Sequence, residues 1–216
     1  MMNILVALND KYVPPLRVML KSMFENNPGE HFSVYLMYSD IPPHEMASLE
    51  RFVEREGHRL IPVYVADDLF KDAVVLRHYT KEMYYRLAAH LFLPEHLDRI
   101  LYLDPDIVVL NAIGELYWID FGQCYFVASE HTHAVKMTGK FNHIRLGIPR
   151  DRGYYNSGVL LMNLELMRKN VDLKQIAEFI EEHKHKLILP DQDVLNGLYW
   201  DKIKPVDGLR YNFDGR

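Results

Sequence analysis

Two carboxylates, Asp104 and Asp106, stand one residue apart at the end of an apolar run that is typical of a buried strand. Residues 99–103 form this run, and the β-branched residues 107–109 follow the pair. An unpaired charge is costly to bury between apolar segments, whereas carboxylate oxygens are preferred ligands of Mg²⁺ and Mn²⁺. Ligands of open α/β sheets bind beyond the carboxyl ends of strands. The pattern favours a cation that bridges a diphosphate, and a plain surface turn stays open as the alternative.

The composition sets limits on the class of protein. The 216 residues suffice for one or two domains, and a formal net charge of −5 gives no general attraction to nucleic acid. The single cysteine, Cys124, cannot form an internal disulfide, which predicts a reducing, cytoplasmic setting. No run approaches the ~20 apolar residues of a membrane span, and no signal peptide is expected. A peripheral membrane contact through a segment beyond residue 216 stays compatible with the sequence.

The helices and strands that must position the two carboxylates are predicted from the periodicity of apolar residues and from Pro and Gly residues, which end such elements. Strands are predicted at residues 3–8, 32–38, 60–65, 99–103, 123–130 and 203–206, and residues 154–163 are predicted as a polar loop that feeds a strand. Helices are predicted at residues 14–25, 43–56, 82–92, 164–169 and 173–183 and from residue 190 onward. Pro62 places its strand at an edge or at a strand start, since it cannot donate to a ladder. The initial β-α-β-α-β order implies a largely parallel sheet with helices on its faces.

Five separated blocks of sequence resemble one enzyme family, the retaining glycosyltransferases of family 8. The blocks are Val6–Tyr12, Tyr84–Leu87, Leu101–Asp106, Tyr155–Val159 and Asp191–Asn196. This family has the GT-A fold and includes bacterial lipopolysaccharide galactosyl- and glucosyltransferases and glycogenin. The resemblance implies an α/β fold with a Rossmann-like, mostly parallel sheet flanked by helices, and one glycosyltransferase domain over residues 1–216. It also implies transfer of a hexose, glucose or galactose, from a UDP-sugar to a glycan or lipid-linked glycan acceptor.

The resemblance assigns a nucleotide-binding role to two parts of the chain. The segment Asp104-Pro105-Asp106 would hold Mn²⁺ or Mg²⁺ at the diphosphate of the UDP-sugar. Tyr12 would stack on the uracil ring, while the backbone of Ala7 and the side chain of Asn9 would bind the edge of the base. The Asn9 position often carries Asp in relatives, but an amide oxygen can still accept a hydrogen bond from uracil N3–H. Lys11 also differs from the usual residue, and ordinary aromatic packing stays an alternative for Tyr12.

Further positions would contact the transferred sugar and the acceptor. Arg86 would reach the donor sugar or phosphate, because its planar fork of donors suits oxygen-rich groups. Asn156 and the Gln192 carboxamide would line the sugar pocket, and Asp191 would bind sugar hydroxyls. His78 matches a position near the acceptor side in relatives. A solvated helical arginine stays the alternative for Arg86.

Retention of the anomeric configuration restricts the mechanism. The usual retaining route needs a carboxylate nucleophile about 5 Å from its partner acid, but the matching residue here, Gln192, is an amide and a poor nucleophile. We therefore favour front-face departure of UDP through an oxocarbenium-like state, in which the leaving phosphate oxygen deprotonates the acceptor hydroxyl. A role for Asp193 stays open, since an acidic residue in the first turn of a helix needs no function.

The end of the sequence departs from the family pattern. Relatives supply a third metal ligand and a diphosphate-binding lysine from a His-x-x-Gly-x-x-Lys-Pro-Trp segment, and no such segment follows residues 211–213. His183 and His185 do not match that motif. The chain is therefore expected to be C-terminally incomplete. The leading alternative function is a catalytically weak or inactive module that binds a sugar nucleotide or a glycan.

Two other enzyme classes fit the sequence less well. Haloacid-dehalogenase-type phosphatases also place Asp-x-Asp at a strand end, but in the first strand of their core, whereas Asp104 follows three predicted strands. Nucleotidyltransferases of similar fold carry a Gly-rich basic loop after the first strand, and residues 9–15 are not such a loop. Transfer of a sugar is therefore the favoured chemistry.

Overall fold

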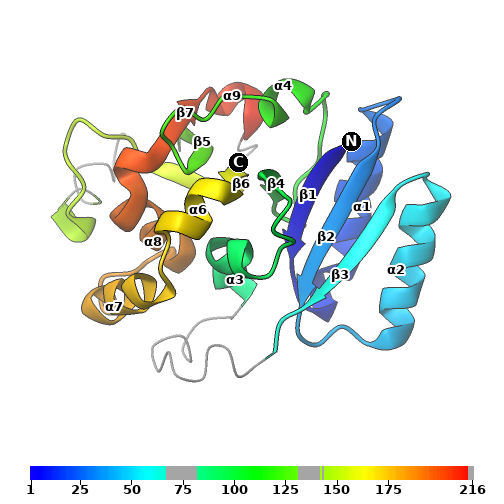
Figure 1. Cartoon of the computed structure of the whole chain (residues 1–216), viewed down its shortest axis with the longest axis horizontal. Helices are drawn as coiled ribbons and strands as arrows, with labels where there is room; N and C mark the ends of the chain where they lie inside the picture. The colour runs from blue at the N-terminus through cyan, green and yellow to red at the C-terminus, as the bar shows by residue number, and fades with distance from the viewer. Residues whose placement is uncertain (67–81, 131–141, 143, 214–216) are drawn as a thin grey trace.

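A computed structural model describes residues 1–66, 82–130, 142 and 144–213, and within these residues one mixed sheet runs through the molecule (Figure 1). The seven strands lie in the order β3-β2-β1-β4-β6-β5-β7. Their bounds are β1 Met2–Ala7, β2 Phe32–Tyr38, β3 Arg59–Tyr64, β4 Arg99–Leu103, β5 Phe126–Glu130, β6 Tyr155–Asn163 and β7 Ile203–Val206. The predicted α/β class is confirmed, and β3, which contains Pro62, is an edge strand as expected.

Strand direction determines which ends meet at the site. β3, β2, β1 and β4 are mutually parallel, as are β5 and β7, whereas β6 runs antiparallel to both of its neighbours. The start of β6 therefore lies beside the end of β4: Leu103 pairs with Val159, and the Asp104 N–H donates to the Gly158 carbonyl at 2.8 Å. The first residues of β6 and the residues just after β4 thus lie at the same end of the sheet.

Helices cover both faces of the sheet, which separates two apolar cores (Figure 1). α1 (Val13–Glu25), α2 (Pro43–Arg55) and α4 (Gly114–Tyr117) pack on one face, where Ile4 and Val6 of β1 point. α3 (Glu82–Ala88), α6 (Leu164–Asn170), α7 (Leu173–His183) and α8 (Pro190–Tyr199) pack on the other face with Leu5 and Ala7. This alternation along β1 is the period-two pattern of a strand that is buried on both sides.

Short elements complete the described chain. They are the 3₁₀ turns Asp10–Tyr12, Ala89–Leu91 and Trp200–Lys202 and the last helix, α9 (Gly208–Tyr211). The predicted helix at 82–92 thus ends at Ala88 and tightens into a 3₁₀ turn. No helix in the parts of the chain that the structure describes is long and apolar enough to cross a membrane.

The start of β6 differs from the sequence prediction of a polar loop. Tyr155 already belongs to the strand. Its N–H donates to Oδ1 of Asn196 at 2.7 Å, and its carbonyl accepts from Nδ2 of Asn196 at 2.8 Å. A buried side chain of α8 therefore satisfies the backbone at this point, which the local sequence of β6 cannot reveal.

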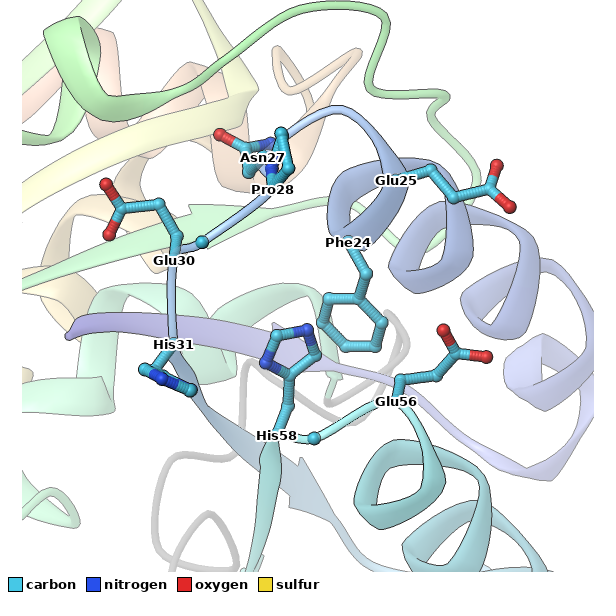
Figure 2. A pocket seen from close by; sticks show the side chains of 10 residues that line it. Phe24, Glu25, Asn27, Pro28, Glu30, His31, Glu56 and His58 are labelled. Carbon is cyan, nitrogen blue, oxygen red and sulfur yellow. The ribbon is translucent and has the colours of Figure 1, made fainter.

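A cleft of about 290 Å³ opens at the amino ends of β2 and β3 (Figure 2). The ends of α1 and α2 form its walls, and Figure 2 shows the rings of Phe24 and His58 next to each other. Their centroids are 3.9 Å apart and their planes are tilted by 44°. Lys21 lies 2.9 Å from Glu56 and 3.3 Å from Glu25, two of the carboxylates at this cleft. The cleft lies at the opposite ends of the parallel strands from Asp104, so it is separate from the site described next.

Candidate functional site

The first aspartate of the Asp-x-Asp pair is held by a residue of the strand that precedes it. Tyr102 and Asp104 lie two residues apart and hence on the same side of the chain, and the Tyr102 hydroxyl donates to Asp104 Oδ1 at 2.6 Å. Burial raises the pKa of Tyr102 well above its ordinary value. The phenol therefore keeps its proton and remains a hydrogen-bond donor to the carboxylate.

Arg86 of α3 lies at the centre of the site and is only 8% exposed. Its Nη2 lies 3.0 Å from Asp104 Oδ1, and its Nη1 lies 3.3 Å from Asp191 Oδ2 and donates to the Ser157 carbonyl at 2.8 Å. The guanidinium also stands 4.3 Å from the Tyr102 ring centroid. Burial alone would lower the pKa of Arg86, but the carboxylates of Asp104 and Asp191 raise it above its ordinary value. The arginine thus stays charged and joins β4, β6 and α8.

Ser157 connects the start of β6 to the first turn of α8. Its hydroxyl donates to Asp191 Oδ2 at 2.9 Å, and its N–H donates to Gln192 Oε1 at 3.2 Å. Gln192 is buried, and its Nε2 makes no hydrogen bond of ordinary geometry to the residues that the structure describes, although it approaches the Tyr154 hydroxyl and lowers the pKa of that group. A buried amide group without an acceptor costs free energy. Gln192 Nε2 is therefore a candidate for contact with a ligand.

Asn156 is fixed through its amide oxygen. Oδ1 accepts from the Gly158 N–H at 2.6 Å and from Nδ2 of Asn212 at 2.7 Å. Because both bonds use the oxygen, the Nδ2 group is the part of Asn156 that remains for a ligand. Asn212, at the end of α9, thus brings the last described residues of the chain to the site.

Asp104 and Asp106 carry carboxylate oxygens, the kind of ligand that hard divalent cations prefer. Oδ1 of Asp104 is engaged by Tyr102 and Arg86, while Oδ2 lies over Gly158, where a Cβ would stand 2.5 Å away. Asp106 is exposed, and carboxylate oxygens suit Mn²⁺ and Mg²⁺. Within the described residues no group of three or more His, Cys, Asp or Glu could hold a metal ion. Asp104 and Asp106, the two predicted ligands, therefore do not belong to a larger cluster of such side chains among these residues.

The residues expected at the uracil ring lie at the same edge of the sheet. Ala7 ends β1, and the parallel register of β1 and β4, continued by two residues, places Ala7 level with Asp104. Asn9 Oδ1 accepts from the Lys11 N–H at 3.2 Å and so begins the 3₁₀ turn, which leaves one further lone pair on that oxygen. Tyr12 is 44% exposed, so its ring is accessible for stacking.

The structure joins five of the predicted site residues directly. One connected network of hydrogen bonds and ion pairs contains Arg86, Asp104, Asn156, Asp191 and Gln192. His78 lies outside the described residues. Sequence reasoning gave no role to Tyr102, Ser157 and Asn212. The two-residue spacing of Tyr102 and Asp104 could have indicated their contact, whereas nothing local predicts the approach of Asn212 to Asn156.

Comparisons with known proteins agree with this arrangement. The sequence model of a family described as Glycosyl transferase family 8 matches residues 3–215. The chain is 30% identical over 206 residues to General stress protein A of Bacillus subtilis (strain 168), covering 93% of this chain and 70% of that protein. It is 25% identical over 205 residues to a lipopolysaccharide 1,2-glucosyltransferase of Escherichia coli, covering 94% of this chain and 60% of that protein.

A solved structure extends the agreement to three dimensions. The crystal structure of the galactosyltransferase LgtC in complex with donor and acceptor sugar analogs matches with a TM-score of 0.86 and 26% identity. The match covers 96% of this chain and 74% of that chain. The present chain therefore spans only part of the length of these relatives.

Proposed function

The chain belongs to glycosyltransferase family 8, and we propose that it transfers a hexose, glucose or galactose, from a UDP-sugar to a saccharide or lipid-linked saccharide acceptor. The fold is that of GT-A glycosyltransferases. One relative is named a lipopolysaccharide glucosyltransferase and another a galactosyltransferase, which supports the hexose and a role in envelope polysaccharide assembly. A cytoplasmic location and a dependence on Mn²⁺ or Mg²⁺ belong to the same proposal.

The observation that carries the proposal is the position of Arg86 between two carboxylates. Asp104, on one side, suits a cation at a diphosphate, and Asp191, on the other, suits sugar hydroxyls. Arg86 adds a permanent positive charge with planar donor geometry, which favours phosphate oxygens. A nucleotide sugar presents a diphosphate and a hydroxyl-rich ring next to each other. It therefore matches a site in which Asp104 and Asp191 lie on the two sides of Arg86.

The cation would be held by Asp104 Oδ2 and the Asp106 carboxylate. When bound, it would act as a Lewis acid that stabilises the negative charge on departing UDP. Arg86 would hold Asp104 Oδ1 in place, and Tyr102 would donate to the same oxygen. Because these two contacts engage Oδ1, Asp104 Oδ2, which lies against Gly158, is the oxygen left for the cation.

The same geometry supports a front-face mechanism. Gln192 Oε1 is engaged by the Ser157 N–H, so Nε2 is the part of its amide left for the sugar. In the proposed step the bond from the anomeric carbon to the UDP oxygen breaks while the acceptor oxygen bonds to that carbon from the same face. The acceptor hydroxyl passes its proton to the leaving phosphate oxygen. If Gln192→Ala left the transfer rate unchanged, Gln192 would have no part in catalysis.

The first experiment is a calorimetric titration of UDP into the chain with Mn²⁺ and again with EDTA. We expect binding that depends on Mn²⁺ and is lost in the Asp104→Ala/Asp106→Ala variant. Asp98→Ala is the matched control, because Asp98 is an exposed aspartate at the other end of β4. Transfer from UDP-glucose and UDP-galactose to saccharide acceptors is then measured with the same variants.

The outcomes separate the proposal from its alternative. Transfer that is lost with Asp104 and Asp106 supports the enzyme. UDP binding without transfer from either donor to any acceptor instead indicates a module that binds a sugar nucleotide. Absence of UDP binding under both conditions contradicts both the enzyme and the sugar-nucleotide module for this chain, and favours the glycan-binding form of the alternative.

A further inference from the structure

Asp193, in the first turn of α8, is fully buried and accepts five hydrogen bonds. Its Oδ1 accepts from Arg145 Nη2 at 2.7 Å and from the Tyr154 hydroxyl at 2.6 Å. Its Oδ2 accepts from Arg145 Nη1 at 2.5 Å and from the N–H groups of Ile188 at 2.7 Å and Leu189 at 3.1 Å. One side chain therefore gathers three separate stretches of the chain.

Arg145 extends this cluster to its surroundings. Its Nη1 also donates to the Lys186 carbonyl at 2.7 Å, and its Nη2 donates to Asn142 Oδ1 at 2.8 Å. Burial would lower the pKa of Arg145, but the bond to Asp193 raises it above its ordinary value. Burial, and then the charge of Asp193, raises the pKa of Tyr154. Arg145 thus stays charged and Tyr154 stays protonated, so both remain donors to the carboxylate.

We propose that Asp193 is a positioning residue that fixes the first turn of α8 so that Asp191 and Gln192 face Ser157 and the donor. This inference rests on the proposed sugar transfer. Successive helical residues point about 100° apart, so a residue held on the buried side determines where its two predecessors project. The bonds from Ser157 to Asp191 (2.9 Å) and Gln192 (3.2 Å) require that orientation.

The same contacts exclude Asp193 as a nucleophile. A covalent route to retention needs a carboxylate at the anomeric carbon, and Asp193 is a carboxylate next to Gln192. A carboxylate has about four lone-pair sites, and this one already accepts five bonds inside the protein. Attack on a sugar would require breaking bonds to Arg145 and to the backbone. Asp193 acts instead through the residues that precede it.

Two variants test this inference. Tyr154→Phe removes one donor to Asp193 and keeps the ring, and Asp193→Asn replaces an acceptor oxygen with a donor group. We expect faster amide hydrogen exchange at Ile188 and Leu189, slightly in the first variant and strongly in the second. For Tyr154→Phe, kcat of transfer should fall about three- to tenfold, the range that corresponds to one hydrogen bond. Affinity for UDP should stay within about twofold of wild type, since its expected contacts lie at the end of β1 and just after β1 and β4.

Tyr117→Phe is the matched control for a purely structural effect. Tyr117 is buried, and its hydroxyl accepts from the Asn3 N–H at 3.0 Å, on the face of the sheet opposite α8. This control should lose comparable stability without losing kcat at a temperature well below unfolding.

Each outcome decides for or against the positioning role. Unchanged amide exchange at Ile188 and Leu189 in both variants overturns it, as does an unchanged kcat in Tyr154→Phe. A raised kcat in Tyr154→Phe would instead indicate that Asp193 is a nucleophile, since its carboxylate attacks more readily when it accepts fewer hydrogen bonds. If the wild-type chain transfers no sugar, the proposed function fails, whereas amide exchange still reports whether Asp193 fixes the turn.

Discussion

Gly158 lies directly against the carboxylate of Asp104, and a Cβ on Gly158 would stand 2.5 Å from Asp104 Oδ2. The two residues face each other across β4 and β6, where the Asp104 N–H donates to the Gly158 carbonyl at 2.8 Å. The backbone hydrogen bond and the ion pair to Arg86 hold Asp104 in place, so its carboxylate cannot move away from a side chain at position 158. Glycine is therefore required at position 158 for space, so that Oδ2 can remain where a cation would meet it.

We predict that Gly158→Ala weakens Mn²⁺-dependent binding of UDP by at least about tenfold, which corresponds to about 1.4 kcal/mol. The added methyl group would displace the carboxylate that holds the cation. Calorimetric titration measures the change. Gly114→Ala is the control, because nothing lies within 4 Å of a Cβ at that position. Equal affinities for the Gly158→Ala and Gly114→Ala variants would contradict the role of this contact.

Arg86→Lys should reduce transfer by about a hundredfold or more, even though it keeps the positive charge. An ammonium group cannot span Asp104, Asp191 and the Ser157 carbonyl, which the planar guanidinium reaches together. Arg86→Met should destabilise the fold by about 3 kcal/mol, since it leaves a buried carboxylate unpaired. Initial rates and urea unfolding measure the two effects.

Arg168→Lys is the matched control for the arginine experiment. Arg168 also donates to several carbonyls, including those of Leu97 and Pro94 at 2.8 Å, but it lies on α6 away from the network. Its loss should lower stability and spare the transfer rate per folded molecule. A similar rate loss in both variants would mean that Arg86 acts only through stability.

Local patterns in the sequence predicted the elements that position the site. Asp104 follows an apolar strand, Arg86 lies on a periodic helix, and Asp191 stands in an acidic first turn after Pro190, so each was recognisable within a few residues. The edge position of β3 was likewise predictable, because Pro62 cannot donate to a neighbouring strand.

Contacts between distant segments could not be predicted in this way. Ser157 binds Asp191 and Gln192 only because β6 runs antiparallel beside β4 and so starts at the carboxyl end of that strand. The bond from Asn212 to Asn156 joins residues 56 positions apart. Neither contact has a periodic signal, since both depend on the order of strands in the sheet and on helix packing.

Asn212→Ala should lower kcat/KM for the donor sugar by about two- to tenfold, the range expected for one hydrogen bond. The loss of its Nδ2 donor frees the Asn156 oxygen, so the Asn156 amide is held less firmly. Steady-state kinetics with varied UDP-sugar measures the change. Asn170→Ala is the control, because Asn170 is exposed and donates to the Leu166 carbonyl on α6 at 2.8 Å. A loss as large in the Asn170→Ala variant would rule out a specific effect.

The cleft in Figure 2 makes stability depend on pH through His58. Burial lowers the pKa of His58 below its ordinary value of 6.5, and the charge of His31 lowers it further, while Glu56 opposes the shift. The unfolded chain therefore takes up this proton more readily than the folded chain. The neutral form of His58 therefore contributes its full share to the stability of the fold above pH 6.5. This contribution is lost as the pH falls from 6.5 through the lower pKa that His58 has in the folded chain.

We predict that the urea midpoint of unfolding decreases between about pH 7.5 and about pH 5, and that His58→Phe reduces this decrease. The phenyl ring keeps a planar group against Phe24, whose ring centroid lies 3.9 Å from that of His58, but it binds no proton. His44→Phe is the matched control, because His44 is an exposed histidine on α2, and it should keep the wild-type dependence on pH. If His58→Phe loses as much stability at low pH as the wild type, other groups cause the acid sensitivity, and the half-buried ring of His58 is not its source.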